Sequence, residues 1–351
     1  MAQILTIVGA RPQFVKAAAV SRALLEKGLK ETIIHTGQHF DAGMSDIFFD
    51  ELGIPAPAHN LAVHSLGHGA MTGRMLEGIE EILRANAPDL VLVYGDTNST
   101  LAGALAASKL HCPVAHVEAG LRSFNRRMPE EINRVMTDHL SDILFCPTRA
   151  AVDNLKREGL ERETHLVGDV MYDATLDAVR RSATRENVAV RLGLAPRGYA
   201  VATIHRAENT DDPVRFARIA DWLAAAAEKQ PIVLPVHPRT RALLNERRPG
   251  GKRVHLIDPL GYLDMARLLS QAAGVFTDSG GLQKEAYFHR VPCVTLRDET
   301  EWIETIDAGW NRLWTVETYR ERSEIADYGE GQASLAIAGI LETFLGADRA
   351  A

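Results

Sequence analysis

The sequence predicts an α/β fold made of two doubly wound domains that face a shared cleft. Short apolar stretches alternate with longer amphipathic or alanine-rich ones, which is typical of βα units that build a parallel sheet with helices on both faces. The alternation begins again near the middle of the 351-residue chain, which is too long for one ordinary core at about 150 residues a domain. Ligands of such sheets bind beyond the carboxyl ends of the strands, so polar residues there are the first functional candidates.

The first half contains short apolar stretches with the composition of buried strands. They are residues 4–8, 32–35, 90–94, 114–117 and 143–146. A helix is expected from about Pro12, because proline fits the first helical turn, and another over the alanine-rich residues 99–107. We therefore expect a Rossmann-like domain over residues 1–175.

The pattern restarts after residues 174–197, which join the two halves. The strands expected next are residues 199–204, 232–236, 254–257, 275–277 and 293–296. Helical stretches over residues 213–228 and 263–273 separate them. A second Rossmann-like domain is therefore expected over residues 176–335, followed by a C-terminal helix over residues 336–351 that packs back on the first domain.

Composition and charge limit the classes of function. With 46% hydrophobic and 24% charged residues, the chain is globular rather than disordered or collagen-like. A formal net charge of -7 argues against a nucleic-acid partner bound by phosphate neutralisation, and no apolar run approaches the about 20 residues of a membrane span. The chain start does not resemble a signal peptide and the three cysteines show no CxxC spacing, so we expect a cytoplasmic protein.

Acidic residues follow two strands of the first half. Asp96 comes after the third predicted strand and Glu118 after the fourth, where a strand tip projects a carboxylate into the cleft. Helix capping by Ser99 or Thr100 explains part of the polarity near Asp96 without any chemistry. Both interpretations of Asp96, a catalytic acid or base and a structural cap, are therefore open.

A third acidic residue, Glu130, lies at a predicted helix start. A proline followed by Glu130 and Glu131 is a helix start signal in its own right, because negative charge offsets the helix dipole. The helical period nevertheless places Glu130, Arg134 and Asp138 on one face and directs Glu131 elsewhere. We therefore expect a buried pair of Glu130 and Arg134, with Glu130 joining the other two carboxylates in a site suited to proton abstraction.

Basic and glycine-rich motifs follow other strands. Arg11 stands beside a helix N-terminus, where free amides and a guanidinium favour a phosphate, although a surface arginine at a strand-helix junction explains it equally. In the second half, His205 and His237 each end a strand next to charged residues, which makes each a better active-site candidate than a lone histidine. Neither has the spacing of a metal ligand pair such as HExxH, so we expect no metal.

The sharpest nucleotide signal is the segment from Phe276 to Glu285, a strand end followed by Asp-Ser-Gly-Gly and a helix. Gly280 and Gly281 let backbone amides approach a pyrophosphate, Ser279 can donate its hydroxyl, and Glu285 can accept from ribose hydroxyls. The motif is neither GxGxxG nor a Walker A loop. A nucleotide diphosphate linked to another group is therefore favoured over NAD or ATP, and no cofactor is expected.

These motifs together resemble the bacterial non-hydrolysing UDP-N-acetylglucosamine 2-epimerases, a family with a two-domain fold similar to GT-B glycosyltransferases. The resemblance runs from Gly9-Ala10-Arg11-Pro12 through Gly95-Asp96-Thr97, the segments 117–122 and 129–134, and His205-Arg206-Ala207-Glu208-Asn209 to Glu285. It implies that UDP-GlcNAc and UDP-ManNAc are interconverted by eliminating UDP to a 2-acetamidoglucal and adding it back on the other face. It also implies a homodimer and a place in polysaccharide biosynthesis.

The resemblance assigns roles residue by residue. Asp96, Glu118 and Glu130 correspond to acid/base carboxylates, and His205 to a residue near the departing phosphate. The substrate- and UDP-binding set comprises Arg11, Lys16, Arg134, His237, Phe276, Ser279, Gly280, Gly281 and Glu285. Which carboxylate serves which face of the sugar is left open.

The sequence also departs from the commonest family pattern. Gln13 stands where Glu is usual after Arg-Pro, and Gln38-His39 is followed by Phe40-Asp41 rather than Arg-Glu, in a region where several relatives bind a second, activating UDP-GlcNAc. With the segments 68–74 and 237–241, these features are similar to the branch acting on UDP-2,3-diacetamido-2,3-dideoxyglucuronic acid, our main alternative substrate. Three competing hypotheses are a hydrolysing epimerase, a GT-B glycosyltransferase and a catalytically silent nucleotide-sugar sensor.

Overall fold

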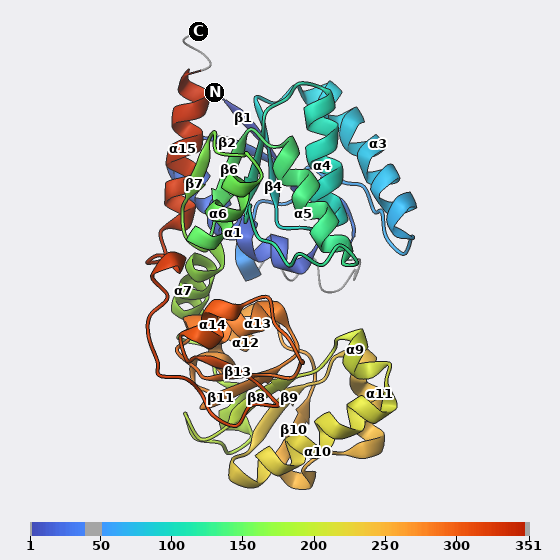
Figure 1. The fold of residues 1–351 in the computed structure, drawn as a ribbon, viewed down its shortest axis with the longest axis vertical. Helices are drawn as coiled ribbons and strands as arrows, with labels where there is room; N and C mark the ends of the chain where they lie inside the picture. Colours follow the sequence, from blue (N-terminus) through green and yellow to red (C-terminus); the bar gives the residue numbers. More distant parts are fainter. Residues whose placement is uncertain (1, 39–50, 348–351) are drawn as a thin grey trace. The chain divides into compact units, whose positions relative to one another are not determined.

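The computed structural model describes residues 2–38 and 51–347, and the chain divides into two compact units. The first unit runs from the N-terminus to Ala174 and resumes at Ala326, whereas the second is Thr175–Ile325. Each unit is a parallel sheet covered by helices (Figure 1). The predicted two-domain α/β fold is therefore confirmed. The segment 39–41, where the sequence departs from the family pattern, lies outside the described residues.

The first unit is built on a seven-stranded parallel sheet with the order β3-β2-β1-β4-β5-β6-β7. The strands are β1 (Gln3–Val8), β2 (Lys30–His35), β3 (His59–Asn60), β4 (Leu90–Tyr94), β5 (Val114–Val117), β6 (Ile143–Cys146) and β7 (Thr164–Leu166). The central strand β4 reads Leu-Val-Leu-Val-Tyr and is buried along its whole length, as expected where helices cover both faces. In the register, Thr6 of β1 lies between Ile33 of β2 and Leu92 of β4.

The helices of the first unit follow the strands in alternation. They are α1 (Arg11–Glu26), α3 (His68–Asn86), α4 (Asn98–Lys109), α5 (Pro129–Leu140), α6 (Arg149–Arg157) and α15 (Ala333–Ala347), while α7 (Val170–Ser182) runs from this unit into the next. A proline is the second residue of α1, and another proline is the first residue of α5. Proline suits these positions because the N–H groups of a first helical turn have no partner within the helix, and proline has no N–H group.

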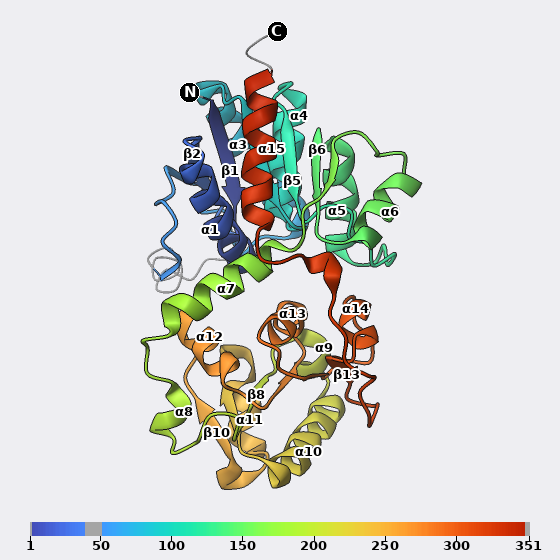
Figure 2. The ribbon, with the colours of Figure 1, turned by 90° about the vertical axis from the view of Figure 1, so that its left-hand side faces the viewer.

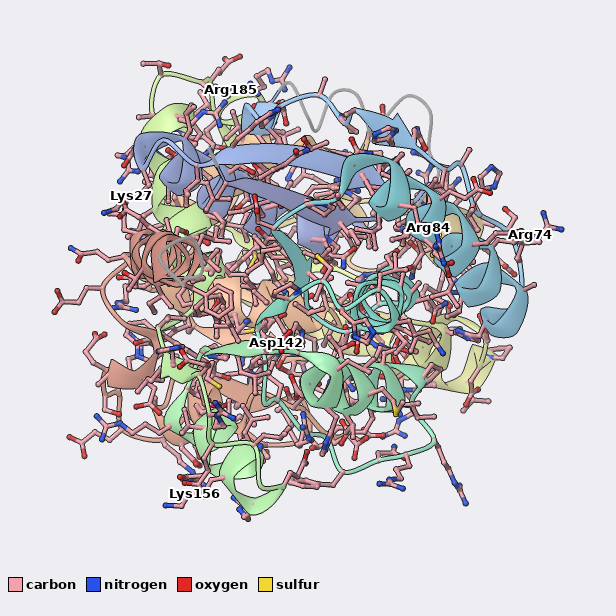
Figure 3. The ribbon with its side chains drawn as sticks, turned by 90° about the horizontal axis from the view of Figure 1, so that it is seen from above. Lys27, Arg74, Arg84, Asp142, Lys156 and Arg185 are labelled. Carbon is pink, nitrogen blue, oxygen red and sulfur yellow. The ribbon has the colours of Figure 1, made fainter. Side chains whose placement is uncertain are left out.

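The C-terminal helix α15 packs on α1 (Figure 2). Lys27, at the end of α1, forms an ion pair of 2.9 Å with Glu342 of α15; Figure 3 shows Lys27 at the outer edge of the fold. The carboxylate of Asp173 caps the start of α15 by accepting the N–H groups of Ala333 and Ser334, at 3.2 and 2.7 Å. The chain thus returns to the first unit at Ala326, ahead of the predicted boundary between residues 335 and 336.

The second unit repeats the same strand order in a six-stranded parallel sheet, β10-β9-β8-β11-β12-β13. Its strands are β8 (Ala200–Thr203), β9 (Ile232–Pro235), β10 (Val254–Ile257), β11 (Gly274–Thr277), β12 (Cys293–Thr295) and β13 (Asn311–Leu313). Its helices are α8 (Val188–Arg191), α9 (Ala207–Thr210), α10 (Pro213–Lys229), α11 (Pro238–Arg247), α12 (Tyr262–Ser270), α13 (Gly280–Phe288) and α14 (Ile303–Asp307).

Both sheets have the dinucleotide-fold order 3-2-1-4-5-6, in which the direction of winding reverses between the first and fourth strands. Those strands are β1 and β4 in the first unit and β8 and β11 in the second. The chain leaves their carboxyl ends at Gly9, Gly95, Ile204 and Asp278. The motifs that contain Arg11, Asp96, His205 and Ser279 therefore begin at these switch points. Within the described residues, no helix is both long and apolar enough to cross a membrane.

Candidate active site

In the first unit, the turn after β1 is closed by a buried glutamine. The side-chain oxygen of Gln13 accepts the N–H groups of Gly9 and Ala10, at 2.8 and 3.0 Å. Its amide nitrogen donates to the carbonyl of Tyr94 and the hydroxyl of Thr100, at 2.8 and 2.9 Å. The N–H groups of Gly9 and Ala10 are thus already bonded, and the contact of Arg11 with a phosphate stays a prediction. Gln13 ties the β1 turn to the β4 turn.

Two carboxylate-cation pairs surround Gly95 at the end of β4. Lys16 of α1 pairs with Glu118, and Arg134 of α5 pairs with Asp96. A Cβ at Gly95 would lie 3.4 Å from the Glu118 carboxylate and 3.5 Å from the Lys16 ammonium, so both pairs meet at one turn. The structure thus brings together four of the predicted residues, and each of the two carboxylates has its own cation.

The expected pair of Glu130 and Arg134 does not form. Glu130 is exposed, whereas Glu131 is 3% exposed and lies 3.1 Å from the guanidinium of Arg134. Glu131 also accepts the N–H and hydroxyl of Ser123 and the N–H of Phe124, at 2.8 to 2.9 Å. Although burial by itself raises the pKa of Glu131, these bonds and the guanidinium hold it below its usual range.

The turns that carry the carboxylates have unusual backbone conformations. Gly95 has φ +64°, which suits glycine, but Glu118 has φ +72° and is not a glycine. A side chain in this left-handed region is strained and is often found at a functional site. The N–H of Gly95 donates to Val117 (2.9 Å) and that of Glu118 to Phe145 (3.1 Å), so the neighbouring strands fix both turns.

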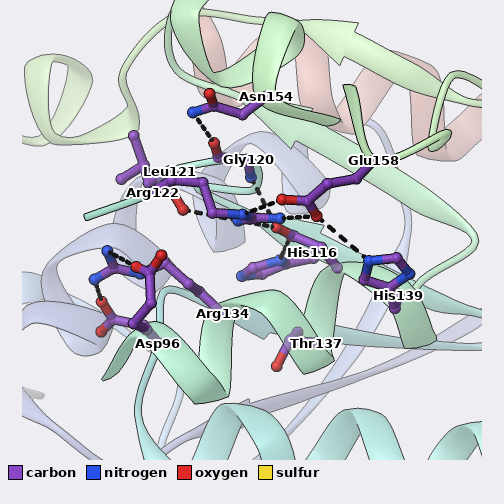
Figure 4. Close-up of polar contacts among 12 residues, drawn as sticks. Asp96, His116, Gly120, Leu121, Arg122, Arg134, Thr137, His139, Asn154 and Glu158 are labelled. Atoms are coloured by element: carbon purple, nitrogen blue, oxygen red, sulfur yellow. Dashed lines mark hydrogen bonds and ion pairs between the residues drawn. The ribbon is translucent and has the colours of Figure 1, made fainter. Parts of the chain in front are cut away.

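A buried polar chain lies beneath these turns (Figure 4). Both ring nitrogens of His116 are bonded, Nε2 to the carbonyl of Gly95 and Nδ1 to Asp138, each at 2.7 Å. Asp138 also contacts Arg122 at 2.7 Å, and Arg122 contacts both oxygens of Glu158. We expected Asp138 on the face of Arg134, but it points into this chain instead. The sequence analysis missed His116, because a buried strand residue gives no signal of its partners.

In the second unit, one buried carboxylate organises the end of β8. Asp278 is 0% exposed and accepts the N–H groups of His205 and Arg206, at 3.0 and 2.9 Å, and the amide of Asn209 at 3.0 Å. The Nδ1 atom of His205 lies 3.2 Å from the same carboxylate. This contact places a proton on Nδ1 and leaves Nε2 of the neutral ring as an acceptor. Burial, more than the opposing Asp278 carboxylate, keeps the pKa of His205 below its usual range.

The helix α13 begins at the predicted glycine pair. The hydroxyl of Ser279 caps it by accepting the N–H of Leu282 at 3.4 Å. The N–H groups of Gly280 and Gly281 have no partner within the part of the chain that the structure describes. A Cβ added at Gly280 would collide with the carboxylate of Glu301. A Cβ added at Gly281 would have no neighbouring atom within 4 Å. This helix end therefore offers free amides of the kind that bind a phosphate.

The remaining predicted residues have distinct positions. His237 is exposed and caps α11, its Nδ1 atom accepting the N–H of Arg239 at 3.2 Å, with its ring 5.6 Å from that of His205. Glu285 is half-buried on α13. Phe276 lies in the hydrophobic core, edge-on to Trp222 at 5.0 Å. Because Phe276 faces the core, we remove it from the predicted binding set.

A surface cavity of about 800 Å³ lies elsewhere, along the edge strand β10. It is lined by Arg241 and Asp258, which pair at 3.0 Å, and by none of the predicted site residues. No group of His, Cys, Asp and Glu side chains in the described ranges is arranged to hold a metal ion.

Two sheets of Rossmann order, each with polar residues at its strand ends, define a two-domain α/β fold of the GT-B type. Phytolacca americana UGT2, complexed with UDP-2fluoro-glucose and pterostilbene, shares this fold with a TM-score of 0.60, covering 98% of this chain and 90% of that one. At 12% identity the likeness concerns the fold alone.

The chain belongs to the UDP-N-acetylglucosamine 2-epimerase family, which it matches over residues 22–342. It is 55% identical over 357 residues to the UDP-2,3-diacetamido-2,3-dideoxy-D-glucuronate 2-epimerase of Pseudomonas aeruginosa, covering 97% of this chain and 99% of that protein. The structure of Methanocaldococcus jannaschii UDP-GlcNAc 2-epimerase in complex with UDP-GlcNAc and UDP is similar with a TM-score of 0.86 and 41% identity, covering 97% of this chain and 99% of that one. The predicted family and the predicted epimerase class are confirmed.

Proposed function

We propose that the protein inverts C2 of a UDP-linked 2-acetamido sugar without hydrolysing it. The observation that carries this proposal is the pair of carboxylates, Asp96 and Glu118, held by separate cations around one turn. A reaction that removes a proton from one face of a sugar carbon and returns it to the other needs an acid/base group for each face. The separate carboxylates supply two such groups.

The C2 proton is not acidified by a neighbouring carbonyl, so departure of UDP must assist its removal. In the proposed step, a base takes the C2 proton as the C1–O bond breaks, and the electron pair of the C–H bond forms the C1–C2 double bond of a 2-acetamidoglucal. UDP leaves with the electrons of the C1–O bond. Re-addition of UDP at C1, with protonation of C2 on the opposite face, gives the epimer.

Asp96 and Glu118 are our candidates for the acid and base, with exposed Glu130 as a third. The charge that develops on UDP is stabilised in this proposal by the free amides of Gly280 and Gly281 and by His205. Fixed donors aimed at developing charge commonly lower a barrier by about 3 kcal/mol each. Arg11, Lys16, Arg134, His237, Ser279 and Glu285 complete the proposed binding set.

For the substrate, we propose UDP-2,3-diacetamido-2,3-dideoxy-D-glucuronate in first place. The support is the 55% identity to the Pseudomonas aeruginosa enzyme over nearly the whole of both chains. UDP-GlcNAc, which the sequence motifs alone favour, is the second candidate, supported by the 41% identical Methanocaldococcus jannaschii structure. We also propose a cytoplasmic homodimer that acts in polysaccharide biosynthesis, and sedimentation as a single 38.5 kDa species would contradict the dimer.

Proton NMR of the purified protein with each UDP-sugar in heavy water tests the proposal. We expect a new anomeric signal for the epimer and deuterium at C2, with a higher kcat/KM for the uronate. Release of free sugar in place of a UDP-linked epimer would identify a hydrolysing epimerase. Binding of both UDP-sugars without deuterium exchange would identify a sensor.

A further inference from the structure

We infer that His116 is a positioning residue: a buried imidazolium that sets the distance between the Asp96 turn and the Glu118 turn. The inference rests on the proposed function, because it concerns the two carboxylates proposed as acid and base. His116 is the third residue of β5, one position before the strand ends. Its side chain is 0% exposed, so His116 acts through other residues and not on the sugar.

The hydrogen-bond partners of the His116 ring show which of its two nitrogens carry protons. The carbonyl of Gly95 can only accept, so Nε2, at 2.7 Å, carries a proton. Asp138 faces Nδ1 with one oxygen, while its other oxygen accepts from Arg122 at 2.7 Å and from the N–H of Gly120 at 3.1 Å. A carboxylate that receives those donors is ionised, so Nδ1 also carries a proton. A ring that donates from both nitrogens is an imidazolium.

The surrounding charges balance this cation. His116 and Asp138 are 0% exposed and Arg122 is 1% exposed at the side chain, and Glu158 closes the series at the surface with two bonds to Arg122, at 2.7 and 2.8 Å. The buried chain thus has two cations alternating with two anions, as buried charges require. Beyond Glu158, exposed His139 contacts its carboxylate at 3.3 Å. Cys146 of β6 lies near this chain, and burial, followed by the charge of Asp138, raises the pKa of its thiol to about 12.

Two neighbouring members of this chain each reach one of the two catalytic turns. His116 binds the carbonyl of Gly95, the residue before Asp96, and Asp138 binds the N–H of Gly120, two residues after Glu118. The Gly120 carbonyl is also held, by the amide of Asn154 at 3.0 Å. The direct bond between His116 and Asp138 therefore joins the two turns. A displacement of about 1 Å in such a pair can cost about 100-fold in rate.

Two substitutions separate the halves of this bridge. In His116→Asn the short amide can replace Nδ1 toward Asp138 but not Nε2, whereas in His116→Gln the longer amide can reach the Gly95 carbonyl. We expect about a 100-fold lower kcat for His116→Asn and about a 10-fold lower kcat for His116→Gln, since the latter keeps the bond to the Asp96 turn. UDP affinity should stay unchanged in both, because the two partners of His116, Gly95 and Asp138, are not in the proposed binding set. His139→Gln, at the exposed end of the chain, is the control and should keep the wild-type rate.

The charge is tested separately by ¹⁵N NMR of histidine-labelled protein, with His116 assigned by its loss in His116→Gln. We expect protons on both ring nitrogens. A ring that carries only one proton, or wild-type kcat in His116→Asn, would overturn the inference. Absence of turnover of both UDP-sugars by the wild-type protein would instead contradict the proposed function, and the NMR signature of the ring would still decide the charge of His116.

Discussion

Lys16 and Glu118 form an ion pair in which the side chains are only 9% and 13% exposed. They come from α1 and from the end of β5, so the pair joins two βα units at the switch point of the first sheet. Removing one member of a well-buried pair leaves the other charge without compensation, which costs more than the pair contributes. Lys16 therefore fixes the direction of the Glu118 carboxylate.

Replacing Lys16 with methionine keeps the length of the side chain and removes its charge. We expect kcat to fall by about 100-fold, within the range attributed to a misplaced acid/base group, and UDP affinity to fall as well, because Lys16 is also in the proposed binding set. Lys27→Met is the matched control, because Lys27 pairs with Glu342 on the surface and such a pair contributes at most about 1 kcal/mol. If Lys16→Met weakened UDP binding and left kcat intact, Lys16 would be a nucleotide ligand.

Glu131 and Glu130 should separate stability from activity. Glu131→Gln removes a buried carboxylate that accepts three bonds and faces Arg134, so we expect a loss of about 2 kcal/mol in the free energy of unfolding. Because the folded-state pKa of Glu131 is lowered, its contribution is present above the unfolded pKa of about 4.3 and is lost as the pH falls further. Urea unfolding of the wild type and Glu131→Gln should therefore converge at acid pH.

Exposed Glu130 is the matched variant for that comparison. Glu130→Gln should leave the urea midpoint unchanged, and a lower rate of C2 deuterium exchange would then assign it to the chemistry. Equal destabilisation by the two substitutions would contradict the distinct environments of these neighbours.

Binding of UDP should be coupled to proton uptake at His205. Burial first, and then the cations of Arg206 and Arg239, hold the pKa of His205 down against the opposing Asp278, and His237 faces it across the rings. A diphosphate at Nε2 favours the charged ring and raises that pKa. At a pH between the pKa of His205 in the free protein and its higher pKa in the complex, His205 takes up a proton when UDP binds. UDP affinity therefore falls as the pH rises through this range.

Calorimetry in buffers of different ionisation enthalpy measures this uptake. We expect the wild type to take up a proton in the pH range between the lowered pKa of free His205 and its raised pKa with UDP bound, and we expect this uptake to be lost in His205→Gln. His139→Gln is the control, because exposed His139 contacts Glu158 in the first unit and should keep the uptake. Uptake that survived in His205→Gln would place the titrating group elsewhere.

His289 should make stability depend on pH. Burial, aided by Arg197, lowers its pKa to about 4. The unfolded chain binds a proton at about pH 6.5 and the folded chain does not, so stability is full above that pH and falls as the pH drops toward 4. We expect a loss of up to about 3 kcal/mol across this range, measured by urea unfolding. His289→Gln should reduce the slope, and an equal slope in both proteins would contradict the assignment.

The central strands could be predicted from sequence because parallel strands buried on both faces are continuous apolar runs. The predicted run 90–94 is β4, and 114–117 is β5. The strands β3, β7 and β13 were missed, since each has only two or three residues and too few apolar side chains to stand out. The segment 326–335 was misplaced because its partners, such as Asp169 bonding to Tyr328, are distant in sequence.

The motifs of the site could be predicted more readily than their partners. The ends of the predicted strands indicated Asp96 and Glu118. The helical period, however, was the only basis for predicting Glu130 rather than Glu131 as the partner of Arg134. The choice depends on the loop of Ser123 and Phe124, which folds over the start of α5 and offers its N–H groups to Glu131. Such a contact is tertiary, and no local pattern carries it.

The helix α15 has a consequence for the order of events during synthesis. The second unit, Thr175–Ile325, is complete once the ribosome has passed its last residue, whereas α1 lacks its covering helix until α15 has left the exit tunnel. Because domains fold as units during translation, the nascent chain must carry an incomplete N-terminal unit while the whole second unit is being made. A stop codon placed just before Ala333 would leave the apolar side of α1 permanently bare, and the product should be retained by chaperones.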